Sequence, residues 1–459
     1  MVAPVKRSAA YDPTYDPLVS DTPGYGQDYP PSYWAASAGP TPGDDGPVDR
    51  DLDVDVAIVG AGYTGLACAL FLAREHGIRA TVLEANRIGW GCSGRNGGQG
   101  QLASGRLQRS QWIARWGKDT ALRLHEEICE GFETFRGLVG EIDCEPQSGG
   151  HLWIAHRPKK MASLRAEAKV WREVFGYKAE ILDRAEVHRR FVRDEDAAGA
   201  MHEPTGISVH PLKLAFGYLA LARRLGVKVR PASPVTSWAT RAGIQYLTTP
   251  GGTVRARAVA VATGGYTGQG LHPKLRNRVM PILSNSLVTR PMTLSEKEAC
   301  NFLTTEAITD TRMLRFYYRR LPDDRVQIGS RSAVTGADAD NPKHLQLLVN
   351  GLHRKFPSLR GIDIEHSWWG WVDMSHDMMP RIWQPDPAQS VYYALGYGGN
   401  GVSYSAQAGR RMAERIAGKG VRADLPLFDS GLPGHPLAPF RRLGQRLLYR
   451  WHYLRDELL

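Results

Sequence analysis

The sequence predicts an α/β protein with a Rossmann-like nucleotide-binding domain and a second, α+β domain that has its own sheet. The first indication is a β-branched run at residues 54–59, followed by a glycine turn, a helical stretch at 66–74 and a strand-like run at 79–84. Strand, helix and strand in such a short span form a βαβ unit, whose crossover requires parallel strands. The second indication is that glycine turns also follow later strand-like runs at 259–262 and 392–395.

The remaining elements follow from the same patterns. Residues 212–225 have helical apolar spacing, 227–230 form a strand-like run, and a helix reaching residue 416 follows the last glycine turn. The proline- and tyrosine-rich N-terminus predicts an extended arm packed on the body. The predicted division is an arm at 1–50, a nucleotide-binding domain at 51–143, 207–283 and 385–425, a discontinuous substrate domain at 144–206 and 284–384, and a basic helical tail at 426–459.

Composition limits the possible functions. With 459 residues, 42% hydrophobic and 23% charged, the chain can bury sizeable cores and is not mostly disordered. No apolar run approaches the ~18 residues of a membrane span, and no apolar secretory segment follows the first residues. The net charge of +11 comes without a nucleic-acid recognition motif, so we expect no nucleic-acid partner. Five widely spaced cysteines without a C-x-x-C pair predict a cytoplasmic protein with no metal site.

The first glycine turn is the most informative motif. Gly60, Gly62 and Gly65 fit G-x-G-x-x-G, a common pattern that gains meaning from its place between a strand and a helix. Gly60 permits the turn, Gly62 lets the backbone approach a pyrophosphate, and Gly65 allows close packing of helix on sheet. Glu84 ends the next strand and can accept hydrogen bonds from a ribose. A carboxylate there disfavours a 2′-phosphate, which leaves FAD or NAD.

Two further glycine-rich segments favour a flavin. Residues 89–98 carry five glycines together with Trp90, Arg95 and Asn96, which favours a binding loop over a flexible surface loop. The turn at 396–401 precedes a helix whose N-terminal dipole could face the flavin N1–C2=O edge, where negative charge builds up on reduction.

These segments, in this order, resemble the FAD-dependent oxidoreductases of the D-amino-acid-oxidase and sarcosine-oxidase group, and most of all their γ-glutamylputrescine oxidase branch. Residues 32–39, 88–99, 316–319 and 325–331 carry the branch resemblance. The resemblance implies non-covalent FAD, because the cysteine that tethers flavin in covalent relatives falls on Gly370 and the loop after the second strand has no histidine. The implied FAD-binding residues are Gly60, Ala61, Gly62, Tyr63, Thr64, Gly65, Glu84, Ala85, Gly91, Cys92, Ser93, Arg95, Asn96, Gly97, Gly98, Gln99, Val235, Thr263, Gly264, Gly398, Gly399, Asn400, Gly401 and Val402.

The implied reaction is hydride transfer from an amine-bearing carbon to flavin N5. The imine then hydrolyses to an aldehyde or keto product, and O2 takes the electrons to give H2O2. The implied substrate is γ-glutamylputrescine or a related amine, which must be neutral when it reacts; a dry aromatic site would lower its pKa. Expected substrate-binding residues are Tyr317, Arg331, Trp369 and Asn400; Trp368, Trp371 and Tyr318 could add aromatic walls or simply be core residues.

Two positions depart from sarcosine-oxidase-type relatives. Their O2-activating lysine falls on Gln327, and the lysine that helps to hold a substrate carboxylate falls on Ser403. We therefore expect an amine without an adjacent carboxylate. Arg331 could bind a remote carboxylate or be an ordinary surface ion-pair residue. Gln327 and Arg331 are the candidate catalytic residues on the oxygen and substrate side.

Two other functions stay open. One is an FAD-dependent dehydrogenase that passes electrons to a quinone or carrier protein, and the other is a basic nucleic-acid-binding flavoprotein. The tail carries apolar residues at helical spacing, so it could touch an anionic membrane, although we expect this face to pack on the body. These residues are Leu443, Leu447, Leu448, Trp451 and Leu454.

Overall fold

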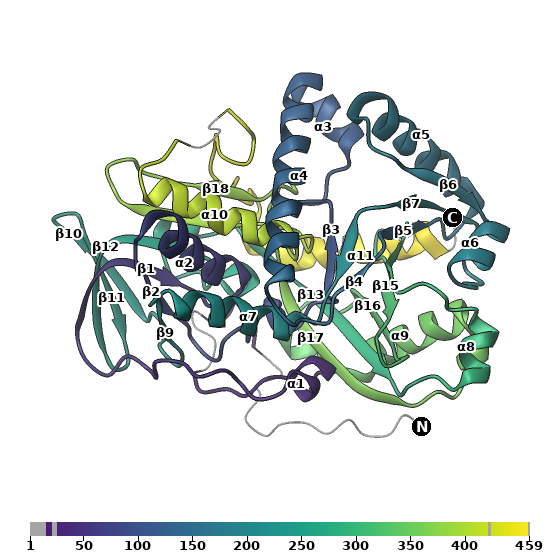
Figure 1. Cartoon of the computed structure of the whole chain (residues 1–459), viewed down its shortest axis with the longest axis horizontal. Coiled ribbons are helices and arrows are strands. Elements are labelled where there is room, and N and C mark those ends of the chain that lie inside the picture. The colour runs from purple at the N-terminus through teal and green to yellow at the C-terminus, as the bar shows by residue number, and fades with distance from the viewer. Residues whose placement is uncertain (1–14, 21–24, 421–423, 458–459) are drawn as a thin grey trace.

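The computed structural model describes residues 15–20, 25–420 and 424–457, which fold into two large sheets, one small sheet and surrounding helices (Figure 1). Elements predicted from the sequence at 54–59, 66–74, 79–84, 212–225 and 392–395 are confirmed, with small shifts at their ends. The helices are α1 (Tyr33–Ser37), α2 (Tyr63–His76), α3 (Arg109–Trp116), α4 (Lys118–Gly140), α5 (Pro158–Phe175), α6 (Arg184–Arg190), α7 (Pro211–Arg224), α8 (Leu294–Cys300), α9 (Pro342–Lys355), α10 (Tyr404–Ile416) and α11 (Arg441–Glu457).

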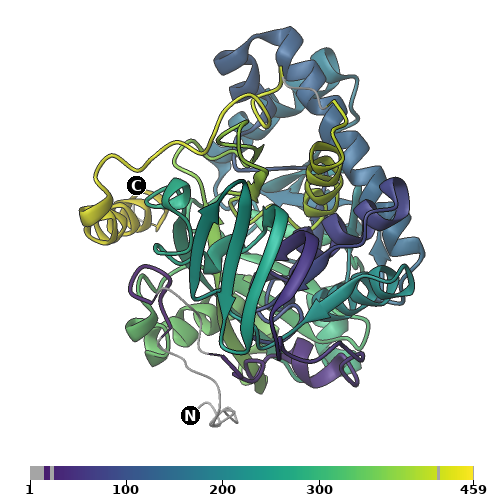
Figure 2. The same cartoon turned by 90° about the vertical axis from the view of Figure 1, so that its left-hand side faces the viewer.

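The first sheet is the predicted Rossmann-like sheet, seen face-on in Figure 2. Strands β12, β1, β2 and β9 lie side by side and parallel, β19 adds a further parallel strand beside β12, and an antiparallel hairpin extends the edge. Helices α2, α7 and α10 cover the face from which Val56 and Ile58 project. The strands are β1 (Leu52–Val59), β2 (Thr81–Leu83), β9 (Lys228–Arg230), β10 (Ser237–Arg241), β11 (Ile244–Thr249), β12 (Gly252–Val261), β18 (Arg381–Trp383) and β19 (Val391–Leu395).

The second sheet has the order β17-β13-β16-β15-β14-β5-β7-β6 and is antiparallel except between β14 and β5. Helices α8 and α9 help to close its core. A small sheet, β3-β8-β4, completes the set. The predicted domain boundaries stay a prediction. The strands are β3 (Gln99–Gln101), β4 (Gln147–Ser148), β5 (His151–Ile154), β6 (Glu180–Asp183), β7 (Gly199–Glu203), β8 (Gly206–Ser208), β13 (Met280–Thr289), β14 (Ala307–Asp310), β15 (Tyr317–Arg320), β16 (Val326–Ser330) and β17 (Ile364–Met374).

The sequence predicted an extended N-terminal arm, but the described part of this segment is not extended throughout. Residues 33–37 form the short helix α1, which Ser32 caps by accepting a hydrogen bond from the backbone N–H of Ala35. Trp34 is only 1% exposed and packs edge-on against Trp368, with ring centroids 6.1 Å apart. The start of the predicted arm, and residues 21–24 within it, lie outside the described residues.

The tail helix α11 is oriented opposite to expectation. Its buried positions are polar, Gln445 and Asp456, whereas the apolar residues that were expected to pack on the body are exposed. Periodicity shows that a helix has an apolar face and a polar face, but it does not show which of them packs on the body. In α11 ion pairs hold the polar face on the body. Among the described helices, none is long and apolar enough to cross a lipid bilayer.

Candidate active site

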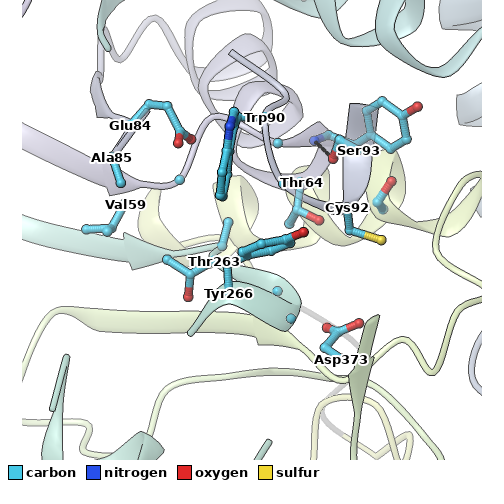
Figure 3. Close-up of a pocket in the computed structure, with 18 of the residues that line it drawn as sticks. Val59, Thr64, Glu84, Ala85, Trp90, Cys92, Ser93, Thr263, Tyr266 and Asp373 are labelled. Atoms are coloured by element: carbon cyan, nitrogen blue, oxygen red, sulfur yellow. Dashed lines mark hydrogen bonds between the residues drawn. The ribbon is translucent and has the colours of Figure 1, made fainter. Parts of the chain in front are cut away.

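A long cleft opens where the parallel strands β1, β2, β12 and β19 end, the usual place for a ligand in an open α/β sheet (Figure 3). Counted with its open mouth it encloses about 1200 Å³, which is ample for a dinucleotide. Sixteen of the predicted cofactor residues line it: Gly60, Gly62, Tyr63, Thr64, Glu84, Ala85, Gly91, Cys92, Ser93, Asn96, Val235, Thr263, Gly264, Gly399, Gly401 and Val402.

The glycines of the first turn lie too close to neighbouring atoms for side chains. A Cβ on Gly60 would lie 2.7 Å from the Ala262 carbonyl oxygen, and the φ of Gly60 is +107°. A Cβ on Gly62 would lie 2.8 Å from Ser93 Oγ, and one on Gly65 would lie 1.9 Å from the carbonyl oxygen of Gly60. Helix α2 then begins with no acidic residue in its first turn, so its positive end is left for an anion.

Glu84 lies at the tip of β2 and lines the cleft. One carboxylate oxygen accepts a hydrogen bond from the backbone N–H of Ala61 at 2.7 Å, and the other accepts one from Asn86 at 3.0 Å. Burial raises the pKa of Glu84, while these backbone donors act in the opposite direction. The carboxylate is thus fixed at the point where the ribose of a dinucleotide is expected.

The loop after β2 forms one wall of the cleft and is held by its own polar side chains. Ser93 Oγ accepts a hydrogen bond from the Tyr63 backbone N–H, and Asn96 Nδ2 donates to the Ser93 carbonyl at 3.0 Å. The guanidinium of Arg95 lies 4.2 Å from the centre of the Trp90 ring and donates to the Trp90 carbonyl. Arg95 therefore braces this loop rather than facing the cleft.

Sequence reasoning did not name three residues of the opposite wall, Tyr266, Asp373 and Tyr397. Asp373 accepts a hydrogen bond from the Gly396 backbone N–H at 2.6 Å, and burial raises its pKa to about 6. Tyr397 shares a hydrogen bond of 2.9 Å with the hydroxyl of Thr64, joining the last glycine turn to α2. In Figure 3, Glu84 and Asp373 lie toward opposite ends of the cleft.

A second cavity of about 780 Å³ adjoins the cleft and shares Cys92, Asn96, Val372, Gly399 and Val402 with it. It contains three of the four predicted substrate residues, Tyr317, Arg331 and Asn400, and four predicted cofactor residues that do not line the cleft, Arg95, Gly97, Gln99 and Asn400. The hydroxyl of Tyr317 lies 2.9 Å from Ser284 Oγ. Ala61, Gly65, Gly98 and Gly398 line neither cavity.

Besides Arg95, which braces the loop after β2, three arginines line this second cavity from three different segments of the chain: Arg106, Arg315 and Arg331. None of them has a carboxylate within ion-pair distance in the part of the chain that the structure describes. Burial together with the charge of the other arginines holds the pKa of Arg106 well below its usual range and lowers that of Arg315 to about 10. Sequence reasoning found only Arg331.

The remaining predicted residues lie beside the two cavities. Gln327 is fully buried on β16 and lines neither, but both its amide oxygen and nitrogen lack a partner among the described residues. A Cβ on Gly97 would lie 3.4 Å from that amide oxygen, so the group points toward the cavity walls. Ser403 donates a hydrogen bond to the Gln101 carbonyl at 2.5 Å and carries no charge into the site.

The aromatic residues of β17 pack elsewhere. Gly370 and Val372 line the second cavity, so strand alternation turns Trp369 and Trp371 to the opposite face. There the two indoles pack with Tyr15, Trp90 and Tyr266 in a buried cluster. Trp368 is buried against Trp34 and, like Tyr318, lines neither cavity. This placement gives no support to a substrate role for Trp369 or for the other three aromatic residues.

The comparisons with known proteins agree with this geometry. The family model described as FAD dependent oxidoreductase matches residues 55–415. The chain belongs to the FAD-dependent oxidoreductase family. Among curated members, it is 34% identical over 444 residues to a gamma-glutamylputrescine oxidoreductase of Escherichia coli, covering 93% of this chain and 98% of the relative. It is also 30% identical to a probable oxidoreductase of Rhizobium meliloti, covering 88% and 92%.

Solved structures of the family share the fold. Glycine oxidase from Geobacillus kaustophilus superposes with a TM-score of 0.67 at 21% identity, covering 81% of this chain and 96% of the other. Iminodiacetate oxidase from Chelativorans sp. BNC1 gives a TM-score of 0.67 at 19% identity, covering 82% and 100%. The chain is therefore an FAD-dependent oxidoreductase acting on amine groups, with a Rossmann-like FAD domain and a second domain.

FAD is the cofactor of this family, and its non-covalent binding is typical. The cleft fits it: Glu84 suits the ribose, the uncapped start of α2 suits the pyrophosphate, and Cys92, Val372 and Gly399 lie where the cleft meets the second cavity. Helix α10, which follows the last glycine turn, likewise has no acidic residue in its first turn. The second cavity adjoins this end of the cleft.

Proposed function

We propose that this family member oxidises an amine that carries a carboxylate away from the reacting carbon, as γ-glutamylputrescine does, and that O2 takes the electrons with formation of H2O2. Bound FAD would accept the hydride from the amine-bearing carbon. The 34% identity to gamma-glutamylputrescine oxidoreductase over nearly both full lengths supports this proposal. The observation that carries it is the group of three arginines in the cavity beside the FAD cleft.

The arginines favour an anionic substrate for a simple electrostatic reason. Three guanidinium groups that line one cavity repel one another, and burial together with this repulsion lowers the pKa values of Arg106 and Arg315. An anion relieves that repulsion, and paired N–H donors match the two oxygens of a carboxylate. A plain alkyl diamine would add positive charge and is disfavoured. Asn400 and Tyr317 add polar groups at the cavity wall.

The cavity also offers different surroundings to the two ends of such a substrate. Cys92, Val372 and Val402 lie at its junction with the cleft, and the amide of Asn96 there is hydrogen-bonded to the loop backbone, so little free polarity remains where the reacting carbon would lie. A weakly polar environment disfavours the ammonium form and so favours the neutral amine that the reaction needs. The carboxylate end would lie toward Arg106, Arg315 and Arg331.

An anaerobic substrate panel tests the proposal. The purified holoenzyme is mixed with γ-glutamylputrescine, putrescine, glycine and sarcosine, and bleaching of the flavin absorbance is followed. We expect fast bleaching with γ-glutamylputrescine and slow or no bleaching with the others. Arg106→Gln and Arg331→Gln should each raise the concentration for half-maximal bleaching by tenfold or more, as loss of a charge-assisted hydrogen bond predicts. Equal bleaching by putrescine would contradict an anionic substrate.

A dehydrogenase is the second candidate, and Gln327 favours it because the position carries no positive charge for oxygen activation. Reduced enzyme that reacts with O2 no faster than free reduced flavin, but rapidly with a soluble quinone, would establish this alternative. In either case we propose that the reaction takes place in the cytoplasm. The five cysteines support that location, because all of them are free thiols in the described residues.

A further inference from the structure

The C-terminal helix α11 packs on the body with its polar face and exposes its apolar face. A helix that packs on a protein normally turns its apolar stripe inward. In α11 the outward residues are Leu443, Leu447, Trp451 and Leu454, which are 56%, 58%, 54% and 45% exposed. They recur at helical spacing and so form one stripe along the helix. Phe440, just before the helix, is 64% exposed beside the same stripe. We call these five residues the outer stripe.

Ionic contacts hold the opposite face of α11 on the body. Arg442 pairs with Asp16 at 2.8 Å and lies over the ring of Trp371 at 4.9 Å. At the far end of the helix, Glu457 pairs with Arg312 at 2.6 Å and with Arg354 at 2.9 Å. Because both ends are anchored through polar groups, the outer stripe cannot turn inward without breaking these ion pairs. The helix is therefore built to present apolar side chains outward.

The exposed charged residues of α11 that border the outer stripe are of one sign. Arg446 and Arg450 are exposed next to it, and neither makes an ion pair with any residue that the structure describes. The acidic residues of the helix, Asp456 and Glu457, face the body instead. A second copy of the chain would bring arginine against arginine across this face, which like-charge repulsion opposes. An anionic surface meets the same arginines with attraction.

We propose that α11 docks the protein on an anionic phospholipid surface, with the outer stripe among the acyl chains and Arg446 and Arg450 at the phosphates. An apolar stripe containing leucine and tryptophan, flanked by arginines, has the composition of helices that lie in the plane of a membrane interface. The helix lies at the edge of the molecule, where a flat surface can reach it (Figure 2).

Docking would also bring the membrane close to the substrate cavity. Tyr449 projects from the inward side of α11 and interacts electrostatically with Arg331 and Arg106. The helix that meets the lipid therefore also lies near two of the arginines of the cavity. Substrate binding and membrane binding can influence each other through this one element.

Vesicle sedimentation of the full-length holoprotein tests the proposal. Sucrose-loaded vesicles of phosphatidylcholine alone are compared with vesicles that also contain phosphatidylglycerol. We expect binding to the mixed vesicles only, weakened by salt. The double variant Leu447→Gln, Trp451→Gln should bind at least about tenfold more weakly, because two apolar side chains no longer enter the bilayer. Arg446→Gln with Arg450→Gln should weaken binding about thirtyfold at low salt.

Leu294→Gln is the matched control, because Leu294 is 74% exposed on α8 and lies outside the outer stripe. It should bind like the wild type, and unchanged FAD content and thermal midpoint would show that every variant is folded. Equal binding to both vesicle types, no binding to either, or undiminished binding by the stripe variant would overturn the proposal. A wild-type dimer that the stripe variant splits would overturn it in favour of a second copy.

Discussion

The hydroxyl of Ser93 accepts a hydrogen bond from the backbone N–H of Tyr63 at 3.0 Å, and this contact joins the loop after β2 to the first turn of α2. Gly62 makes the contact possible, since a Cβ there would lie 2.8 Å from Ser93 Oγ. The wall of the FAD cleft and the start of the helix that faces the pyrophosphate are therefore positioned by one close approach.

Gly62→Val should abolish FAD retention. Its branched side chain would push Ser93 away and occupy space beside the start of α2, where the pyrophosphate is expected. The ratio of flavin to protein absorbance after gel filtration measures the effect. Gly137→Ala on α4 is the control, because a Cβ there meets no atom within 4 Å and alanine favours the helix. A yellow Gly62→Val protein would show that the motif does not bind FAD.

FAD should be released when the protein is precipitated with acid. Gly370 has no side chain to form a link, and a Cβ there would lie 3.0 Å from the Arg95 side chain. Burial raises the pKa of Cys92, the one thiol lining the cleft, to about 12, so the reactive thiolate is scarce. We expect all flavin absorbance in the supernatant; colour retained in the washed pellet would contradict this.

Reoxidation of the reduced enzyme by O2 should depend on Arg331 more than on Gln327. A fixed positive charge stabilises the anion that O2 becomes when it takes up an electron, and loss of such a group costs about 10²–10³ in rate. Gln327 carries no charge and lines neither cavity, whereas Arg331 directly follows β16 and lines the second cavity. Stopped-flow mixing of reduced Arg331→Met and Gln327→Met with O2 compares them. Equal slowing in both would assign no special role to Arg331.

Asp373→Asn should remove part of the pH dependence of stability. Burial raises the Asp373 pKa to about 6, above the 3.8 of the unfolded chain, so the folded state binds this proton more tightly. The stability that protonation provides is complete below pH 4 and is lost as pH rises toward 6, by up to about 3 kcal/mol. Asparagine keeps an acceptor for Gly396 but cannot ionise.

Thermal or urea unfolding of both proteins between pH 4 and 8 measures the difference between the two profiles. Other buried groups, such as Glu203, titrate in the same range, so only this difference reports on Asp373. We expect the variant to gain relative stability as pH rises from 4 to 6 and the gap to stay constant above. A gap that does not change with pH would show that Asp373 has an ordinary pKa.

The Rossmann-like sheet could be predicted from the sequence because its information is local. The run at 54–59, the three glycines and Glu84 lie close together, and each has one physical reason for its place. The substrate side depends on contacts between distant segments. Arg106 and Arg315 follow β3 and β14, respectively, and no spacing in the sequence shows that these ends meet Arg331.

The position of the aromatic residues of β17 relative to the cavity could not be predicted, because it depends on strand register. Alternation along β17 places Trp369 and Trp371 on one face and Gly370 and Val372 on the other, but which face meets the cavity follows only from the pairing with β13. The same problem applies to the tail helix. The sequence shows its apolar stripe but does not show whether the stripe faces the body or the solvent. Periodicity predicts that a strand or helix has an apolar face, but tertiary contacts determine what that face packs against.

The order of strands in the first sheet bears on how the protein is made. Strand β12 pairs with β1 near the beginning of the chain and with β19 at residues 391–395. During synthesis from the N-terminus, β1, β2 and β12 are complete long before the ribosome reaches β19 and α10. The nascent protein must therefore hold an unfinished sheet edge, exposed to wrong pairing, until most of the chain has been translated. Cofactor capture is accordingly a late event in the life of each molecule.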